Sequence, residues 1–232
     1  MDTQAAAPAR PSRVAAARLE WERRTNSFTE LAQAVREAGL NRRTPAFYWV
    51  LFGALTLALA AGITGMALLG ESWFQLLIAA ALGIIFTQFA FLGHEASHRQ
   101  VFASGKANDR FGRVLATFFV GISYAWWMTK HTRHHGNPNQ VGRDPDITPG
   151  FVAFTPEDVA AARGIQAWTT KRQGWLFFPL LPLVGVDLHQ LSIRRLFERG
   201  RLEGRAVELA LLGARFAAYF GLVFWLLPVG MA

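Results

Sequence analysis

The sequence contains no cysteine among its 232 residues. This absence excludes disulfide bonds, thiolate catalysis, and zinc or iron–sulfur sites built from cysteine ligands. Charge is also scarce, because Asp, Glu, Lys and Arg together make up 17% of the residues, whereas apolar residues make up 52%. Soluble domains usually carry about 25% charged residues, so the composition favours a membrane protein.

The charged residues that are present give an excess of positive charge, with a formal net charge of +8. Such an excess is common in nucleic-acid-binding proteins, but the sequence contains no recognisable nucleic-acid-binding motif. The basic residues instead stand beside long apolar segments, which is typical of cytoplasmic flanks that face anionic lipid. We therefore expect membrane lipid as a partner and no nucleic acid.

Three apolar segments are expected to span the membrane, namely residues 45–69, 74–93 and 209–232. The first contains no charged side chain and is long enough to cross a bilayer as a helix. Eight Arg residues precede it and the turn at 70–73 has no Lys or Arg, so the positive-inside rule places residues 1–44 in the cytoplasm. Arg215 is expected to face protein or to lie near the cytoplasmic end of its span, because a charge in lipid is costly.

Two further apolar segments are not expected to span. If residues 111–128 crossed the bilayer, the histidine clusters described below would lie on opposite faces, so we predict an interfacial or re-entrant segment. Residues 176–186 are too short to cross and contain Pro179 and Pro182. They are predicted to lie on the membrane surface and to continue into a basic helix at 188–205. Residues 94–205 are then a cytoplasmic and interfacial region.

Short polar signals predict where two surface helices begin. Ser27–Glu30 fits a capping box, which predicts an amphipathic helix at the membrane surface that ends near Gly39, after a mobile segment at 1–26. Thr155–Asp158 predicts a second helix start, with the helix ending by Gly164.

Five of the six histidines lie in two clusters, His94 and His98 in HEASH, and His131, His134 and His135 in HTRHH. On a helix, residues at i, i+3 and i+4 share one face, so the imidazoles of each cluster can converge on a metal. HEASH taken alone fits a zinc protease with Glu95 as general base, and it fits a chance match equally well. HTRHH adds more imidazoles than one catalytic zinc can use, so the pair of clusters favours iron and two metal ions.

The two clusters, with HEASHR at 94–99, the stretch GISYAWWMTKHTRHHGNPN and the GRDPDI that follows, resemble the membrane fatty-acid desaturase family. The nearest resemblance is to bacterial linoleoyl-CoA or acyl-lipid desaturases. It implies an all-α, multi-pass membrane protein, with residues 1–232 as one desaturase-type domain. It also implies a non-haem centre of two irons at the cytoplasmic membrane surface, with five iron ligands in this chain: His94, His98, His131, His134 and His135.

The resemblance implies a reaction and its partners as well. The expected reaction introduces a double bond into a fatty acyl-CoA or acyl-lipid, with O₂ as oxidant. Electrons are expected from a separate donor of the ferredoxin or cytochrome b5 type with its reductase. The family has a third box, [HQ]xxHH, and eight or more imidazoles in its site, whereas this sequence has two boxes and five imidazoles in them. We therefore expect a chain truncated before the third box and inactive in isolation.

Other polar residues near the boxes have weaker interpretations. Four residues after the second box are expected either to orient the histidine rings or to form turns: Asn137, Asn139, Asp144 and Asp146. Three basic residues are expected either to bind a CoA or phospholipid head group or to be ordinary cytoplasmic flanking charges: Arg99, Lys130 and Arg133. His189 is either an extra ligand or structural, and Glu95 is expected to support a neighbouring ligand.

Three alternatives remain open at this level. A hydroxylase, ketolase or alkane monooxygenase would use the same scaffold and the same metal chemistry. An intramembrane zinc metalloprotease would use HEASH, although HTRHH would then have no role. A non-enzymatic membrane scaffold would explain the missing third box.

Overall fold

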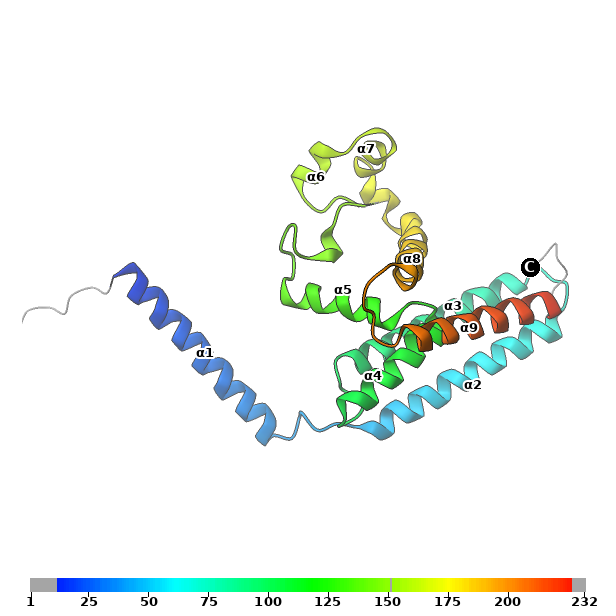
Figure 1. Ribbon diagram of the computed structural model, residues 1–232, viewed down its shortest axis with the longest axis horizontal. Helices are drawn as coiled ribbons and strands as arrows, with labels where there is room; N and C mark the ends of the chain where they lie inside the picture. Colours follow the sequence, from blue (N-terminus) through cyan, green and yellow to red (C-terminus); the bar gives the residue numbers. More distant parts are fainter. Residues whose placement is uncertain (1–11, 151, 227–232) are drawn as a thin grey trace, which may run out of the picture. The chain divides into compact units, whose positions relative to one another are not determined.

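The structure is a computed structural model that describes residues 12–150 and 152–226. The chain divides into two compact units, residues up to Thr44 and residues from Pro45 onwards, and each is considered by itself. Every regular element among the described residues is a helix (Figure 1). The predicted all-α class is therefore confirmed.

The first unit contains one long helix, α1 (Arg13–Glu37). The predicted start at Ser27 is wrong, because the helix begins fourteen residues earlier and Ser27 Oγ donates to the Arg24 carbonyl 3.0 Å away, inside the helix. Ion pairs at i,i+4 spacing, Arg18–Glu22 and Glu20–Arg24, support the added turns. The predicted end is confirmed by Gly39, whose φ of +70° suits glycine. Residues 13–26, predicted to be mobile, belong to this helix, and residues 1–11 lie outside the described residues.

The second unit is built on a hairpin of two long helices, α2 (Pro45–Leu69) and α3 (Gln75–Ser97). The Gln75 amide donates to the carbonyls of Met66 and Gly70, at 2.8 and 2.9 Å, and fixes the turn between them. Within the most apolar 18-residue windows of these helices, 11% and 17% of the residues are buried. Their exposed apolar side chains need lipid to cover them, as predicted for two membrane spans.

The apolar core lies where the hairpin packs against a later segment of the chain. Leu55 of α2, Phe89 and Leu92 of α3, and Leu115 pack together, and Phe89 is fully buried. Burying a side chain of this size contributes about 1.5–3 kcal/mol. The Phe89 ring stacks on Phe119 with 4.3 Å between ring centroids. The core therefore joins the hairpin to the segment that contains Leu115 and Phe119.

That segment is α4 (Gly105–Arg113), which continues into a π-helix, η1 (Val114–Val120). It ends at Gly121, where φ is +96° and the chain turns back towards α5 (Tyr124–Gly136). The predicted apolar segment 111–128 is thus broken in its middle and is not one of the four helices in the described chain long and apolar enough to span. This agrees with an interfacial or re-entrant segment.

The carbonyls at the end of η1 are paired by side chains from two distant helices. Arg215 of α9 (Arg205–Leu226) donates to the carbonyls of Phe118 and Phe119. His189 Nε2 of α8 (Gln173–Phe197) lies 3.1 Å from the Val120 carbonyl. The last carbonyls of a helix lack intrahelical donors and carry partial negative charge, so a cation is favourable there. Arg215 accordingly faces protein, as predicted from the cost of exposing it to lipid.

The sequence prediction for residues 176–205 is wrong in its boundaries. One helix, α8, runs through both Pro179 and Pro182 and ends at Phe197, and no helix covers 198–204. Gly200 and Gly204 have φ of +109° and +73° there, a backbone conformation that ends helices. Proline inside a helix is tolerated where neighbouring groups satisfy the freed backbone.

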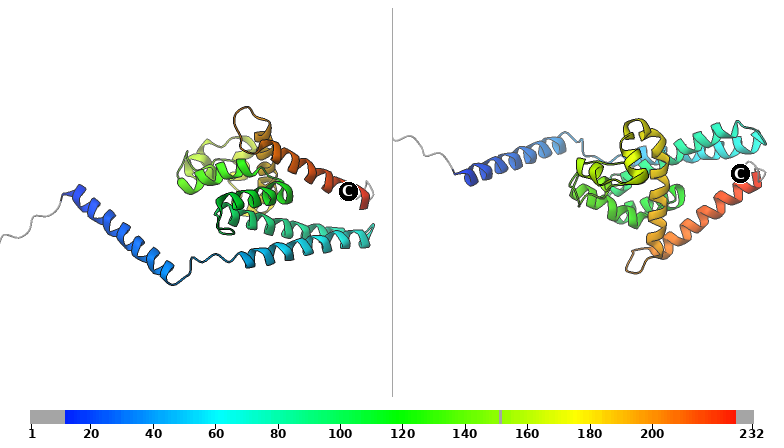
Figure 2. Two further views of the ribbon diagram at one scale, coloured as in Figure 1. Left: turned by 60° about the horizontal axis from the view of Figure 1, so that its bottom comes forward. Right: turned by 90° about the horizontal axis from the view of Figure 1, so that it is seen from above.

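By length and composition, four described helices could cross a membrane: α2, α3, α8 and α9. The predicted count of three omits α8. However, α8 is seen nearly end-on in Figure 1, whereas α2, α3 and α9 run across the page, and Figure 2 also shows α8 lying crosswise. This arrangement is consistent with α8 on the membrane surface, which stays a prediction. The last span begins at Arg205 rather than 209, and residues 227–232 lie outside the described part.

The remaining short helices connect α5 to α8: η2 (Pro145–Ile147), α6 (Pro156–Ala161) and α7 (Gly164–Thr170). The start of α6 is a capping box, as predicted, because Thr155 Oγ1 accepts from the Asp158 N–H and Asp158 Oδ2 accepts from the Thr155 N–H, both at 3.1 Å. α6 ends at Ala161, before Gly164.

The turn at Gly121 gives the first prediction. Gly121→Ala should lower the thermal unfolding midpoint in detergent, because a left-handed alanine costs about 1–2 kcal/mol. The added Cβ would also stand 2.6 Å from Arg215 Nε. Gly213→Ala in α9 is the matched control, since a Cβ there meets nothing within 4 Å, and its midpoint should be unchanged or higher. Equal midpoints for both variants would contradict the role of Gly121.

Candidate metal centre

The two histidine clusters lie at the C-terminal ends of two helices. His94 is in the last turn of α3 and His98 is its C-cap residue, whereas His131, His134 and His135 are in the second half of α5. The carbonyl end of a helix carries partial negative charge and favours a nearby cation. Both helices therefore present imidazoles and a favourable dipole end to the same region.

Four of the five predicted ligands come together there: His94, His98, His131 and His135. Each offers one ring nitrogen, and these four nitrogens all lie within 4.8 Å of one another. His98 Nε2 and His131 Nε2 are 3.0 Å apart. We call these residues the four-histidine cluster.

Burial keeps the centre of this cluster neutral. His131 is 8% exposed, and its burial, followed by the neighbouring imidazoles of His94, His135, His98 and His134, lowers the pKa of His131 from 6.5 to about 4. A neutral imidazole keeps the lone pair that a metal needs. One face of the His131 ring is covered by Trp127, which stacks on it at 4.9 Å between centroids and an interplanar angle of 18°.

The fifth predicted ligand, His134, lies beside the cluster and is held by a carboxylate. Its Nδ1 is 2.9 and 3.0 Å from the two oxygens of Asp144, and 3.2 Å from Asp146 Oδ2. Asp144 is buried. Burial alone would raise the pKa of Asp144, but the bonds from His134 and from the Asn139 N–H hold it below its usual value. A carboxylate that accepts a hydrogen bond from Nδ1–H leaves the lone pair of His134 Nε2 free to bind a metal.

The residues present fit a metal ion such as iron. Nitrogens bound to one ion at about 2.1 Å lie no more than about 4.2 Å apart, so the separations in the four-histidine cluster need only small shifts to bind one. Imidazole ligands without thiolate suit iron and zinc alike. His134, Asp144 and Asp146 form a second group of possible donors, within 4.8 Å of one another. Among the described residues these two groups are where a metal could be held.

Two predicted residues point elsewhere. Glu95 accepts a hydrogen bond from Tyr48 on α2, with 3.3 Å between Oε2 and Oη, and is not part of the four-histidine cluster. His189 has Nδ1 2.8 Å from the Gly185 carbonyl and Nε2 3.1 Å from the Val120 carbonyl. Both of its ring nitrogens therefore face backbone oxygens, which favours the structural interpretation of His189.

The other polar residues near the boxes divide between the two interpretations. Asp144 and Asp146 orient a histidine ring, whereas the Asn137 amide donates to the Arg133 carbonyl at 3.0 Å, as a turn residue does. Lys130 pairs with Asp146, and its pKa is lowered by burial. The role of Arg99, Lys130 and Arg133 in binding a head group stays a prediction.

Sequence reasoning missed the residues that hold the start of α5. Glu208 is fully buried and accepts hydrogen bonds from Arg113 and from Ser123 and Ala125. The signal in the sequence that could have indicated Glu208 was its position as a single carboxylate at the edge of an apolar span. Nor did the sequence show that Trp127 covers the ring of a predicted ligand, His131.

Comparison with known proteins gives consistent matches. A sequence model of the fatty acid desaturase family matches residues 71–232. Among curated proteins, the chain is 26% identical over 223 residues to a Delta(8)-fatty-acid desaturase of Helianthus annuus, covering 87% of this chain and 44% of that protein. It is 28% identical over 189 residues to the Delta(6)-fatty-acid desaturase fat-3 of Caenorhabditis elegans, covering 78% of this chain and 41% of that protein.

A third relative is Fatty acid desaturase 3 of Bos taurus, 28% identical over 172 residues, with 71% of this chain and 39% of that protein covered. The chain thus spans less than half the length of these three relatives. No solved structure matches it.

The geometry predicts which histidines are needed for metal binding. His131→Ala should weaken Co²⁺ binding by the purified chain, measured from the visible absorption of the bound ion, by about ten-fold or more, because His131 is the buried centre of the cluster. His189→Ala should leave Co²⁺ affinity unchanged and lower the thermal midpoint, because it removes the bond to Val120. A loss of Co²⁺ affinity in His189→Ala would identify His189 as a ligand.

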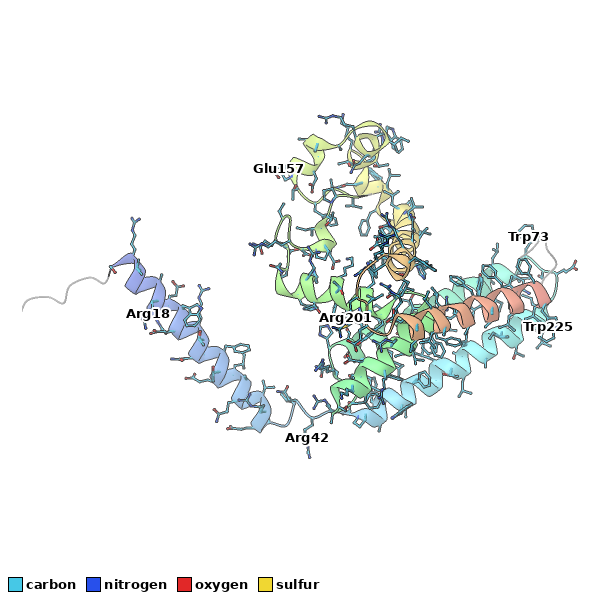
Figure 3. All side chains as sticks on the ribbon, in the orientation of Figure 1. Arg18, Arg42, Trp73, Glu157, Arg201 and Trp225 are labelled. Carbon is cyan, nitrogen blue, oxygen red and sulfur yellow. The ribbon has the colours of Figure 1, made fainter. Side chains whose placement is uncertain are left out.

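Asp144 gives a separate prediction. Asp144→Asn should weaken Co²⁺ binding by about 10–100-fold, as the loss of a carboxylate that orients a histidine ligand usually does. The matched control is Glu157→Gln, an exposed acidic residue on α6, labelled in Figure 3. Unchanged affinity in Asp144→Asn would show that the negative charge of Asp144 is not needed to orient His134.

Proposed function

Because the chain belongs to the fatty acid desaturase family, we propose that it supplies the first two histidine boxes of an acyl desaturase. This oxidoreductase introduces a double bond into a fatty acyl chain, using O₂ and a di-iron centre. The observation that carries the proposal is the convergence of His94, His98, His131 and His135 from two helix ends. The relatives named above are themselves fatty-acid desaturases.

Five residues would hold the iron: the four-histidine cluster and His134 through its Nε2. When bound, iron of this kind supplies the oxidising power, with O₂, to remove hydrogen from an unactivated CH₂ group. The protein residues around it hold and orient the ligands. Asp144 keeps the Nδ1 proton of His134 in place, burial keeps His131 neutral, and Trp127 covers one face of the His131 ring.

The proposed location is the cytoplasmic face of the cell membrane. Two exposed tryptophans, Trp73 at the hairpin turn and Trp225 near the end of α9, lie at one end of the helices, and Arg201 lies at the other (Figure 3). Tryptophan is common at membrane interfaces and Lys and Arg are common on the cytoplasmic side. HEASH ends the helix that begins beside Trp73, so the histidine boxes lie at the end where Arg201 lies.

The proposed substrate is a fatty acyl-CoA or an acyl-lipid. Few residues of the candidate spans are buried, so these helices need lipid around them, and the histidine box HEASH stands at the end of one of them. Electrons would come from a separate ferredoxin or cytochrome b5 type donor with its reductase. Residues 1–44 are proposed to be cytoplasmic, and the apolar side chains of α1, Trp21 and Phe28 among them, are proposed to lie against lipid.

A zinc protease is less well supported. Such an enzyme needs Glu95 beside the metal as general base, but Glu95 is bonded to Tyr48 on α2. The number of imidazoles that converge also exceeds what one catalytic zinc uses.

The experiment that tests the proposal separates desaturation from oxygen insertion. Host cells that express the source gene are supplied with ¹⁸O₂, and their fatty acids are analysed by mass spectrometry. The expected result is a new double bond with no ¹⁸O in the acyl product. A hydroxylase, ketolase or monooxygenase would retain ¹⁸O in the product, and no change in the fatty acids would count against any of these activities.

Two variants of the same gene serve as controls, and they give a further prediction. His98→Ala should abolish the new product, because it removes a ligand of the four-histidine cluster. Glu95→Gln should keep most of the product, because a glutamine can still accept the hydrogen bond from Tyr48. Equal loss of product in both variants would favour a direct role for Glu95.

A further inference from the structure

Glu208 is a buried carboxylate that the reaction does not use. It lies in the first turn of α9 and is 0% exposed. Its oxygens accept hydrogen bonds from Arg113 Nε at 3.1 Å, Ser123 Oγ at 2.5 Å and the Ala125 N–H at 3.0 Å. A buried carboxylate is tolerated only when it is paired and hydrogen-bonded, and these donors fulfil that requirement.

Two of the three donors belong to the beginning of α5. Ser123 is the N-cap residue of α5, and its Oγ also accepts from the Trp126 N–H. Ala125 is in the first turn, where backbone N–H groups have no partner inside the helix and carry partial positive charge. The carboxylate of Glu208 therefore binds the N-terminus of α5 directly, and Arg113 ties the same carboxylate to the end of α4.

The opposite end of α5 carries the second histidine box. His131 follows Ala125 by six residues, which at 1.5 Å per residue is about 9 Å along a rigid helix. Any rotation or shift of α5 at its N-terminus is consequently transmitted to His131 and His135. The α4–η1 segment packs on α3, which carries the first box.

We propose that Glu208 is a positioning residue for the metal centre. Glu208 joins the start of α5 to α4 and α9. It thereby sets the rotation of α5 and its position along the helix axis, and so the position of the second histidine box relative to the first. The inference rests on the proposed function for its role in the metal centre. It assigns Glu208 no contact with substrate or metal.

The first experiment measures Co²⁺ binding by the purified chain in detergent. Glu208→Asp keeps the negative charge and the pair with Arg113 but shortens the side chain by one methylene, so it cannot reach both donors at the start of α5. We expect Glu208→Asp to lower Co²⁺ affinity by about ten-fold and to change the absorption spectrum of the bound ion, with helix content close to wild type. Glu203→Gln, an exposed acidic residue just before α9, is the matched control. Wild-type affinity and spectrum in Glu208→Asp would overturn the proposal.

The second experiment does not depend on metal. Because the chain has no cysteine, Lys106→Cys on α4 and Thr132→Cys on α5, both exposed positions, can carry spin labels, and electron paramagnetic resonance gives the distribution of distances between them. A narrow distribution that broadens or shifts in Glu208→Asp and Glu208→Ala supports the proposal. An unchanged distribution overturns it.

The two experiments separate the two proposals. If the wild-type chain binds no Co²⁺ while the label distances still depend on Glu208, the metal centre fails and the positioning of α5 stands. If the wild-type chain binds Co²⁺ and neither measurement responds to Glu208, the metal centre stands and the positioning role fails.

Discussion

The structure depends on pairing polar backbone groups inside a largely apolar body. The π-helix η1 ends among phenylalanines of the core, and its last carbonyls have no donors of their own. An unpaired carbonyl in such surroundings costs several kcal/mol, on the order of a lost hydrogen bond with no water to replace it. Arg215 and His189 supply the donors. Since these residues belong to α9 and α8, pairing the end of η1 also fixes where the two later helices attach.

The same need to pair buried polar groups explains the arrangement of the histidines. In α5, one face carries the imidazoles, the N-terminus is held by a buried carboxylate, and the loop that follows returns Asp144 to the ring of His134. The two buried carboxylates, Glu208 and Asp144, thus each accept hydrogen bonds from a defined direction. A ligand set held in this way is already close to the geometry that a metal requires, so little ordering remains to be done when the ion binds.

The sequence was sufficient for the features set by local chemistry. The uncharged runs gave the spans at residues 45–69 and 74–93, the i,i+4 spacing gave the faces of the histidines, and Thr155 with Asp158 gave the start of α6. It failed where distant contacts decide. The proline residues of α8 suggested an interruption, but the helix continues through them, and Ser27 looked like a cap although it lies within α1. Glu208 could not be found from its neighbours, because its partners are 83 to 95 residues away.

That separation has a consequence for the order of synthesis. Chains emerge from the ribosome N-terminus first, so both histidine boxes are made well before the acceptor that anchors α5, which follows Ser123 by 85 residues. Until α9 has been synthesised, the start of α5 lacks the carboxylate that accepts hydrogen bonds from Ser123 and Ala125. The proposed positioning of α5 by Glu208 can therefore begin only after α9 has been made.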